Sequence, residues 1–205
     1  FPADPVVRDI ARRLYQQIAH LPIVSPHGHT DPRWFAKDES FENATRLLLL
    51  PDHYVFRMLY SQGISLESLG IRRKDGVAVE SDYRKIFHIF ANHYHLVRGT
   101  PSRIWLDSVF HDVFGLRQTL TAASADFYYD EINRQLNTDA FRPRALLDKF
   151  NIEFIATTEG ALNDLKYHAA LKGSGYEKRV VTTFRPDDVV DADRADFADN
   201  IAKLA

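Results

Sequence analysis

Cysteine is absent from the 205 residues of the chain, and methionine occurs once, at Met58. Without thiols the protein cannot form disulfides or use thiolate chemistry, and any metal must be bound by His, Asp or Glu. Long hydrophobic runs are also missing, since no apolar stretch approaches the roughly 20 residues that cross a bilayer. Hydrophobic residues still make up 45% of the chain, which is ordinary for a globular protein with a packed core.

A strong charge of either sign is lacking as well. Lys and Arg number 26 and Asp and Glu 28, so the formal net charge is -2. This balance gives no reason to expect nucleic acid or a membrane surface as a partner. The N-terminus has no signal-peptide pattern, and a chain without cysteine suits a reducing compartment. We therefore expect a cytoplasmic protein.

Hydrophobic periodicity divides the chain into three parts, namely residues 1–34, 35–150 and 151–205. The first part is expected to hold a helix and a buried strand, and the second part is mostly helical. In the third part strand and helix alternate, which is typical of βαβ units with a parallel sheet, so the predicted fold class is α/β. The predicted strands are 21–25, 152–156 and 179–184, and the main predicted helices are 4–20, 81–95, 101–115, 124–136, a short one from Pro143, 161–171 and 194–204.

Two histidines, His27 and His29, follow the first predicted strand, with Gly28 between them. Side chains at i and i+2 of an extended segment point to the same side, so both imidazoles can reach one divalent metal. The position also fits, because active sites of parallel α/β barrels lie at the carboxyl ends of the strands. The alternative is a pair of histidines with no ligand role, and the preceding strand and the following turn favour the metal.

A second group of polar residues, at 52–57, includes His53, Tyr54 and Arg57. Tyr54 and Arg57 are three apart and would share one face of a helix. An imidazole and a phenol can transfer protons, and a guanidinium binds carboxylates. Taken alone, the segment is better explained as a solvated helix start capped by Asp52.

Arg185 stands just past the third predicted strand, at the same functional edge of the sheet. A cation there suits an acidic substrate, while the competing interpretation is an ion pair with Asp187 or Asp188. His88, His93 and His95 are expected on one helix, without an acidic partner at matching spacing, and we assign them no ligand role. The aromatic residues of 83–129 are interpreted as the core of the helical part.

Six segments together resemble the uronate (glucuronate) isomerase family of the amidohydrolase superfamily. In the printed sequence they are LPIVSPHGHTDP at 21–32, DHYVFR at 52–57, GTPSRIWL at 99–106, FRPRAL at 141–146, ATT at 156–158 and FRPD at 184–187. The family's order of motifs is kept and the set covers nearly the whole chain. The chain differs at Gly28, where many relatives have Cys, at Thr30, where they have Leu, and at Glu159, where they often have Asp.

The resemblance implies a TIM-type (β/α)8 barrel with a helical insertion after strand 1, of which this chain holds about the first three strands. Such a barrel typically needs about 250 residues, so the remaining strands, with further metal ligands and a catalytic Asp, are expected outside this chain. The implied activity converts aldehyde-form hexuronates to 2-keto sugar acids. His27 and His29 would bind a divalent metal, expected to be zinc, while His53, Tyr54 and Arg185 would contact the substrate. Full-length enzyme is expected to form a homo-oligomer.

Two alternatives stay open at this point. A metal-dependent amidohydrolase or lactonase of the same superfamily would use the same histidine pair, because a metal-activated water is what hydrolysis needs. The chain could also be an inactive fragment that serves only in an assembly.

Overall fold

A computed structural model describes residues 2–72 and 74–205, which form two compact units. The first unit runs through Glu39 and continues from Pro143 to Ala205, and the second is Ser40–Arg142. The predicted helical part, residues 35–150, is wider than the second unit at both ends. Phe35 and Leu147 belong to the first unit because they pack in the core beneath its sheet.

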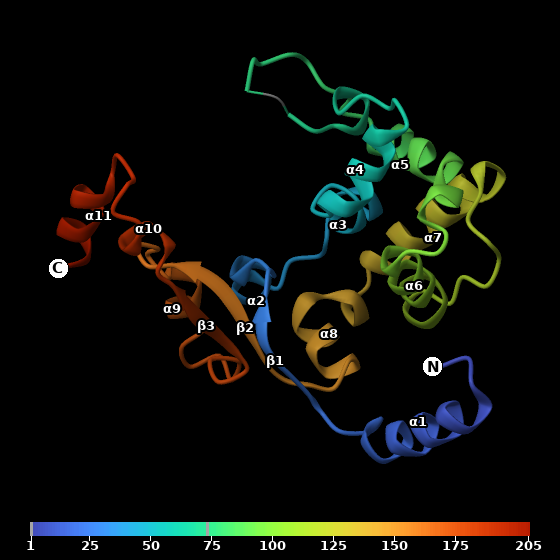
Figure 1. Ribbon diagram of the computed structural model, residues 1–205, viewed down its shortest axis with the longest axis horizontal. Coiled ribbons are helices and arrows are strands. Elements are labelled where there is room, and N and C mark those ends of the chain that lie inside the picture. Colours follow the sequence, from blue (N-terminus) through green and yellow to red (C-terminus); the bar gives the residue numbers. More distant parts are fainter. Residues whose placement is uncertain (1, 73) are drawn as a thin grey trace. The chain divides into compact units, whose positions relative to one another are not determined.

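The first unit contains a three-stranded parallel sheet of order β1-β2-β3, which confirms the predicted α/β class (Figure 1). Its strands are β1 (Ile23–Gly28), β2 (Ile152–Gly160) and β3 (Val180–Arg185). Its helices are α1 (Pro5–Ile18), α2 (Pro32–Lys37), α8 (Pro143–Lys149), α9 (Lys166–Ala170), α10 (Asp187–Val190) and α11 (Phe197–Leu204). β1 extends three residues beyond the predicted strand, so His27 lies in the strand and not in a loop. The prediction that this strand is buried is wrong for the described chain, where Ile23 and Val24 are both half-exposed.

One face of the sheet is covered by helices. Phe35 of α2, Leu147 of α8 and Leu171 after α9 pack there with Ile155 and Val180 of the central and third strands. This arrangement follows from the strand period of two, because Ile155 and Val180 are register partners and point to the same side. The helical face is therefore the packed side of the unit.

A polar clasp joins the two segments that flank the second unit. Asp38 closes α2 in the left-handed conformation, and its Oδ1 accepts a hydrogen bond from the Arg144 backbone at 2.9 Å. The Arg144 side chain in turn donates to the carbonyls of Phe35 at 2.8 Å and Ala36 at 3.2 Å. These carbonyls are unpaired at the end of a helix, so the arginine satisfies them. The chain can leave and re-enter the first unit here without disturbing its sheet.

The second unit is helical, as predicted. It contains α3 (Ala44–Leu48), α4 (His53–Ser61), α5 (Tyr83–Asn92), α6 (Pro101–Ser108) and α7 (Ala125–Leu136), with short 3-10 turns at Glu67–Leu69, Tyr94–Val97, Ala122–Ser124 and Asp139–Phe141 and a π-helical turn at Val109–Val113. The single helix predicted over 81–95 is wrong at its end, because α5 stops at Asn92. The predicted aromatic core is confirmed for Phe87, Phe90, Tyr94 and Tyr128, which are at most 2% exposed, whereas Phe127 is 52% exposed and lies outside it.

Membrane-crossing helices are not found in the part of the chain that the structure describes, since none of its helices is both long and apolar enough.

Candidate active site at the strand ends

The first strand carries an irregularity at the position of the histidines. Ser25 pairs with Ile155 and Gly28 pairs with Thr157, so β1 advances three residues where β2 advances two. The extra residue falls at 26–27, and Pro26 has no backbone N–H to give to a ladder. Bulges of this kind bend a strand and redirect its side chains, and they are frequent beside active sites.

His27 and His29 converge on the face of the sheet opposite to the helices. A Cβ placed on Gly28 would lie 3.6 Å from the Ile155 side chain, so position 28 faces the helical side. The neighbouring histidines therefore point the other way. Their Nε2 atoms lie 3.1 Å apart and the rings meet edge to face at 79°.

This geometry fits a shared metal ion. Two nitrogens bound to Zn²⁺ at tetrahedral positions are separated by about 3.3 Å, given Zn–N bonds of about 2.0–2.1 Å. His27 and His29 already bring their Nε2 atoms to 3.1 Å, and both are exposed and so accessible to an ion. Within residues 2–72 and 74–205, no cluster of three or more His, Cys, Asp or Glu side chains could hold a metal. The described residues supply two ligands of the three or more that a metal site requires.

Arg185 ends β3 on the same face as the histidine pair. Its register partner is Gly160, and Thr183, two residues earlier, pairs with Thr158. Since Ile155 and Val180 face the helices, the alternation of side chains places Arg185 on the opposite, helix-free side. β1 and β3 are two strand spacings apart, roughly 10 Å. The histidine pair and a guanidinium therefore line one face at the carboxyl edge of the sheet.

The Arg185 guanidinium is half-exposed and paired with Asp187. Nε lies 3.2 Å from Oδ2 and a terminal nitrogen 3.3 Å from Oδ1. The hydrogen bonds from Arg185 hold the pKa of the Asp187 carboxyl below its usual range. The structure thus bears out the ion pair considered from the sequence, and an anionic ligand would have to compete with Asp187 for the guanidinium.

His53, Tyr54 and Arg57 lie on α4 in the second unit. Asp52 caps this helix, its Oδ1 accepting hydrogen bonds from the Tyr54 backbone at 2.8 Å and the Val55 backbone at 3.2 Å. The His53 and Tyr54 rings are 4.2 Å apart between centroids. All three side chains are exposed, with Tyr54 at 64%. They form one polar turn that is open to a ligand.

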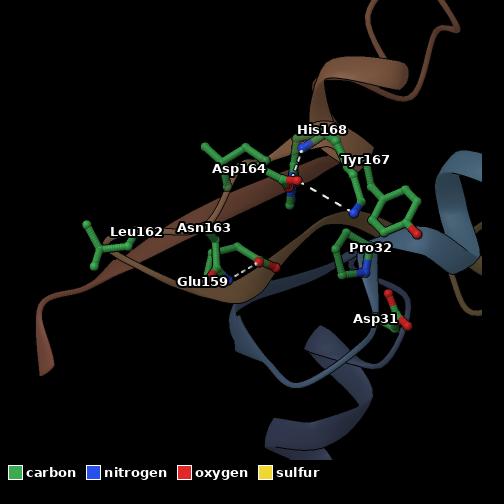
Figure 2. Close-up of a pocket in the computed structure, with 10 residues that line it drawn as sticks. Asp31, Pro32, Glu159, Leu162, Asn163, Asp164, Tyr167 and His168 are labelled. Atoms are coloured by element: carbon green, nitrogen blue, oxygen red, sulfur yellow. Dashed lines mark hydrogen bonds and ion pairs between the residues drawn. The ribbon is translucent and has the colours of Figure 1, made fainter. Parts of the chain in front are cut away.

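A cavity of about 460 Å³ opens between the loop after β1 and the loop after β2, and Figure 2 shows its lining side chains. The carboxylates in its wall are engaged locally. Glu159 accepts a hydrogen bond from Asn163 at 2.9 Å, Asp164 pairs with Lys166 at 3.5 Å, and Asp31 caps α2 by accepting from the Arg33 backbone. Much of this loop was predicted as helix, but α9 begins only at Lys166.

The neighbouring threonines of β2 were missed as site residues when the sequence was considered alone. Thr157 is fully buried on the helical side, where its hydroxyl lies 2.9 Å from His168 Nε2. Thr158 faces the histidine side and donates to the Gly28 carbonyl at 2.6 Å. A pair of hydroxyl residues at the end of a central parallel strand was the available signal.

The other histidines are bound into the structure in ways that spacing did not indicate. His88 has an acidic partner that is distant in sequence, because its Nε2 lies 2.9 Å from Asp126 of α7. His93 contacts the Ile89 carbonyl at 2.7 Å. His88, His93 and His95 do not share one helix, because His93 follows the end of α5.

Comparison with known proteins gives one consistent result. The family model described as glucuronate isomerase matches residues 6–205. A uronate isomerase of Xanthomonas euvesicatoria pv. vesicatoria (strain 85-10) is 61% identical over 197 residues, which cover 96% of this chain and 42% of the relative. A uronate isomerase of Rhizorhabdus wittichii is 59% identical over 204 residues, covering 100% of this chain and 42% of the relative.

Solved structures agree with these relatives. The crystal structure of glucuronate isomerase from Caulobacter crescentus matches with a TM-score of 0.91 and 52% identity, covering 99% of this chain and 42% of that one. The uronate isomerase of Thermotoga maritima, at 21% identity, shares the fold with a TM-score of 0.83 over 95% of this chain and 41% of its own. The chain therefore spans less than half the length of the relatives that it matches.

Proposed function

The chain belongs to the glucuronate isomerase family, and we propose that it forms part of an enzyme that interconverts a hexuronate and its 2-keto isomer. The substrates are D-glucuronate and D-galacturonate, giving D-fructuronate and D-tagaturonate. The observation that carries the proposal is the common face of His27, His29 and Arg185 at the carboxyl edge of a parallel sheet. A metal site and a guanidinium on one surface suit a sugar that has a carbonyl at one end and a carboxylate at the other.

The complete fold in this proposal is a (β/α)8 barrel. Three parallel strands with helices on one side and polar side chains on the other are what one sector of such a barrel contains. The helix-free face then becomes the barrel interior. The second unit, Ser40–Arg142, is an insertion between the first and second strands, and the clasp between Asp38 and Arg144 keeps its two ends together.

His27 and His29 would hold a divalent metal in this enzyme, with zinc as the proposed ion. The bound metal would polarise the sugar's carbonyl oxygen and stabilise the negative charge that develops there when the C2 proton leaves. Each imidazole would supply its Nε2 as a ligand. The extended backbone at His27–His29 fixes their spacing before a metal arrives, which lowers the cost of binding.

The remaining steps belong to the side chains. Isomerisation moves a proton from C2 to C1 through an enediol, while protons also shift between O1 and O2. Tyr54 serves the oxygen protons, with the His53 ring tilted against it at 4.2 Å between centroids. Either Tyr54 or an Asp outside this chain takes the C2 proton. Arg185 or Arg57 binds the C6 carboxylate through charge-assisted hydrogen bonds.

Turnover by the full-length enzyme tests this proposal. D-glucuronate and D-galacturonate should give ketose, whereas D-glucose, which lacks the carboxylate, should react poorly. Replacing Arg185 with Met should raise KM for the uronates by about 10- to 100-fold, the value of a hydrogen bond to a charged group, if this arginine holds the carboxylate. Arg57→Met is the matched comparison. Hydrolysis of lactones or amides without isomerisation of any uronate would replace the proposal with a hydrolase.

A further inference from the structure

The hydroxyl of Thr158 bonds directly to the peptide that carries the metal-binding histidines. Thr158 Oγ1 lies 2.6 Å from the Gly28 carbonyl oxygen, across the boundary between β1 and β2. A carbonyl only accepts, so the hydroxyl must donate, and its orientation is fixed. The Gly28 carbonyl belongs to the peptide group that joins Gly28 to His29. Its orientation therefore bears on where the His29 ring points.

The backbone ladder alone holds this segment less firmly than an ordinary strand. The register between β1 and β2 is interrupted between Ser25 and Gly28, and Pro26 has no N–H to donate. Gly28 also lies tight against β2, since a Cβ there would be 3.3 Å from the Ala156 carbonyl. A side-chain hydrogen bond at Gly28 then compensates for the irregular pairing and keeps the segment close to its neighbour.

Thr158 differs in this respect from the two threonines nearest to it. Thr157 faces the helices and bonds with His168. Thr183 faces the same side as Thr158, but its hydroxyl donates at 3.0 Å to the Thr157 carbonyl, one strand away from the histidines. Thr158 is the threonine of the three whose hydroxyl bonds to the 27–29 segment.

We infer that Thr158 is a positioning residue, which orients the Gly28–His29 peptide so that His27 and His29 present their Nε2 atoms to one metal ion. The inference rests on the proposed function for the metal itself. Residues that do not bind a metal themselves but hydrogen-bond to its ligands fix the orientation of those ligands. Loss of such a residue typically lowers metal affinity by about 10- to 100-fold. The hydroxyl acts on the backbone and does not contact the metal or the substrate.

The test compares Thr158→Val, which keeps the shape and removes the hydroxyl, with Thr158→Ser, which keeps the hydroxyl. Thr183→Val is the matched control, because it removes a similar threonine-to-carbonyl bond elsewhere on the same face. Zn²⁺ and Co²⁺ affinity is measured by titration of the metal-free full-length protein. Imidazole nitrogen NMR of His27 and His29, also without metal, reports their ring contact independently. Thermal unfolding establishes that the variants are folded.

We expect Thr158→Val to weaken Zn²⁺ binding about 10- to 100-fold and to alter the imidazole spectrum, with Thr158→Ser and Thr183→Val close to the wild type. Equal losses in Thr158→Val and Thr183→Val would overturn the inference, because they would reflect a weakened sheet. An unchanged imidazole spectrum in Thr158→Val would also overturn it. If the wild-type protein binds no metal but the imidazole spectrum of Thr158→Val is altered, Thr158 still positions the histidines. That result would refute the metal in the proposed function. Should Thr158→Val fail to fold, Thr158→Ala is read in the same way.

Discussion

The two units of this chain differ in how much of their apolar surface they bury by themselves. In the second unit, side chains such as Phe87 and Tyr94 are almost completely enclosed. In the first unit, α1 buries none of its residues, and Val6 and Leu14 are 68% and 66% exposed. A helical unit closes its core through contacts that are near in sequence, whereas a parallel sheet is fully covered only when other elements pack on both of its faces.

The same contrast applies to the chemistry. The first unit supplies the His27–His29 pair and a guanidinium on a sheet face, and the second supplies a tyrosine and a histidine on one helical turn. If the proposed function is right, substitutions in the two units should fail in different ways. Loss of metal should follow changes in the first, and loss of proton transfer with metal retained should follow changes in the second.

The largest effect is expected for His27→Ala and His29→Ala in the full-length enzyme. Each removes a nitrogen ligand, and the lost electrostatic stabilisation of several kcal/mol corresponds to a fall in kcat/KM of about 10³-fold or more. Metal content after exhaustive buffer exchange should fall with activity. His53→Ala, in the other unit, should retain its metal. Full metal content and activity in both His27→Ala and His29→Ala would rule out the site.

Tyr54→Phe should lower kcat by about 10²-fold, the usual contribution of one proton-transfer group. The hydroxyl is lost while the ring remains, and Tyr54 is 64% exposed. The melting temperature and the metal content should therefore hardly change. Steady-state kinetics with D-glucuronate and a thermal melt measure the two quantities. A variant that turns over at half the wild-type rate or better would remove Tyr54 from the mechanism.

A matched pair of leucines sharpens the structural comparison. Leu106 of α6 is fully buried, and Leu106→Ala should cost about 2–5 kcal/mol of unfolding free energy through lost burial and a cavity. Leu14 of α1 is 66% exposed, and Leu14→Ala in the 205-residue chain should cost no more than about 0.5 kcal/mol. Denaturant unfolding measures both. Comparable losses would mean that α1 is covered in this chain, for instance by self-association, which sedimentation would detect.

The smallest effect concerns acid stability of the second unit. Hydrogen bonds from Arg134, and then from Gln135, lower the pKa of Glu131 from 4.5 to about 2. A carboxyl whose folded pKa is depressed adds stability above its unfolded pKa, and the contribution is lost as pH falls from about 4.5 toward 2. Glu131→Gln should therefore make the melting temperature less dependent on pH between about 4.5 and 2. Arg134→Gln removes the other partner of the same ion pair and should have the same effect. If the melting temperatures of both variants fell with acid pH just as the wild type's do, the lowered pKa of Glu131 would be contradicted.

Much of the fold followed from local patterns in the sequence. The three strands, the helical character of the middle region and the aromatic core at 83–129 were all predicted, because strand alternation and helical periodicity are properties of neighbouring residues. Boundaries were less accurate. β1 continues past Ser25 because Gly28 pairs with Thr157 of β2, and the loop before α9 replaces a predicted helix.

The sequence by itself determined the kinds of ligand available and the spacing of His27 and His29, since composition and the i, i+2 relation do not depend on the rest of the fold. Only the tertiary structure decided what surrounds them. The bulge and the hydrogen bond from Thr158 arise from the register between β1 and β2, which are more than a hundred residues apart. The shared face with Arg185 also depends on the register between β2 and β3. Asp126 became the partner of His88 in the same way, through the packing of two helices. Contacts of this range depend on how elements pack, and spacing along the chain does not encode them.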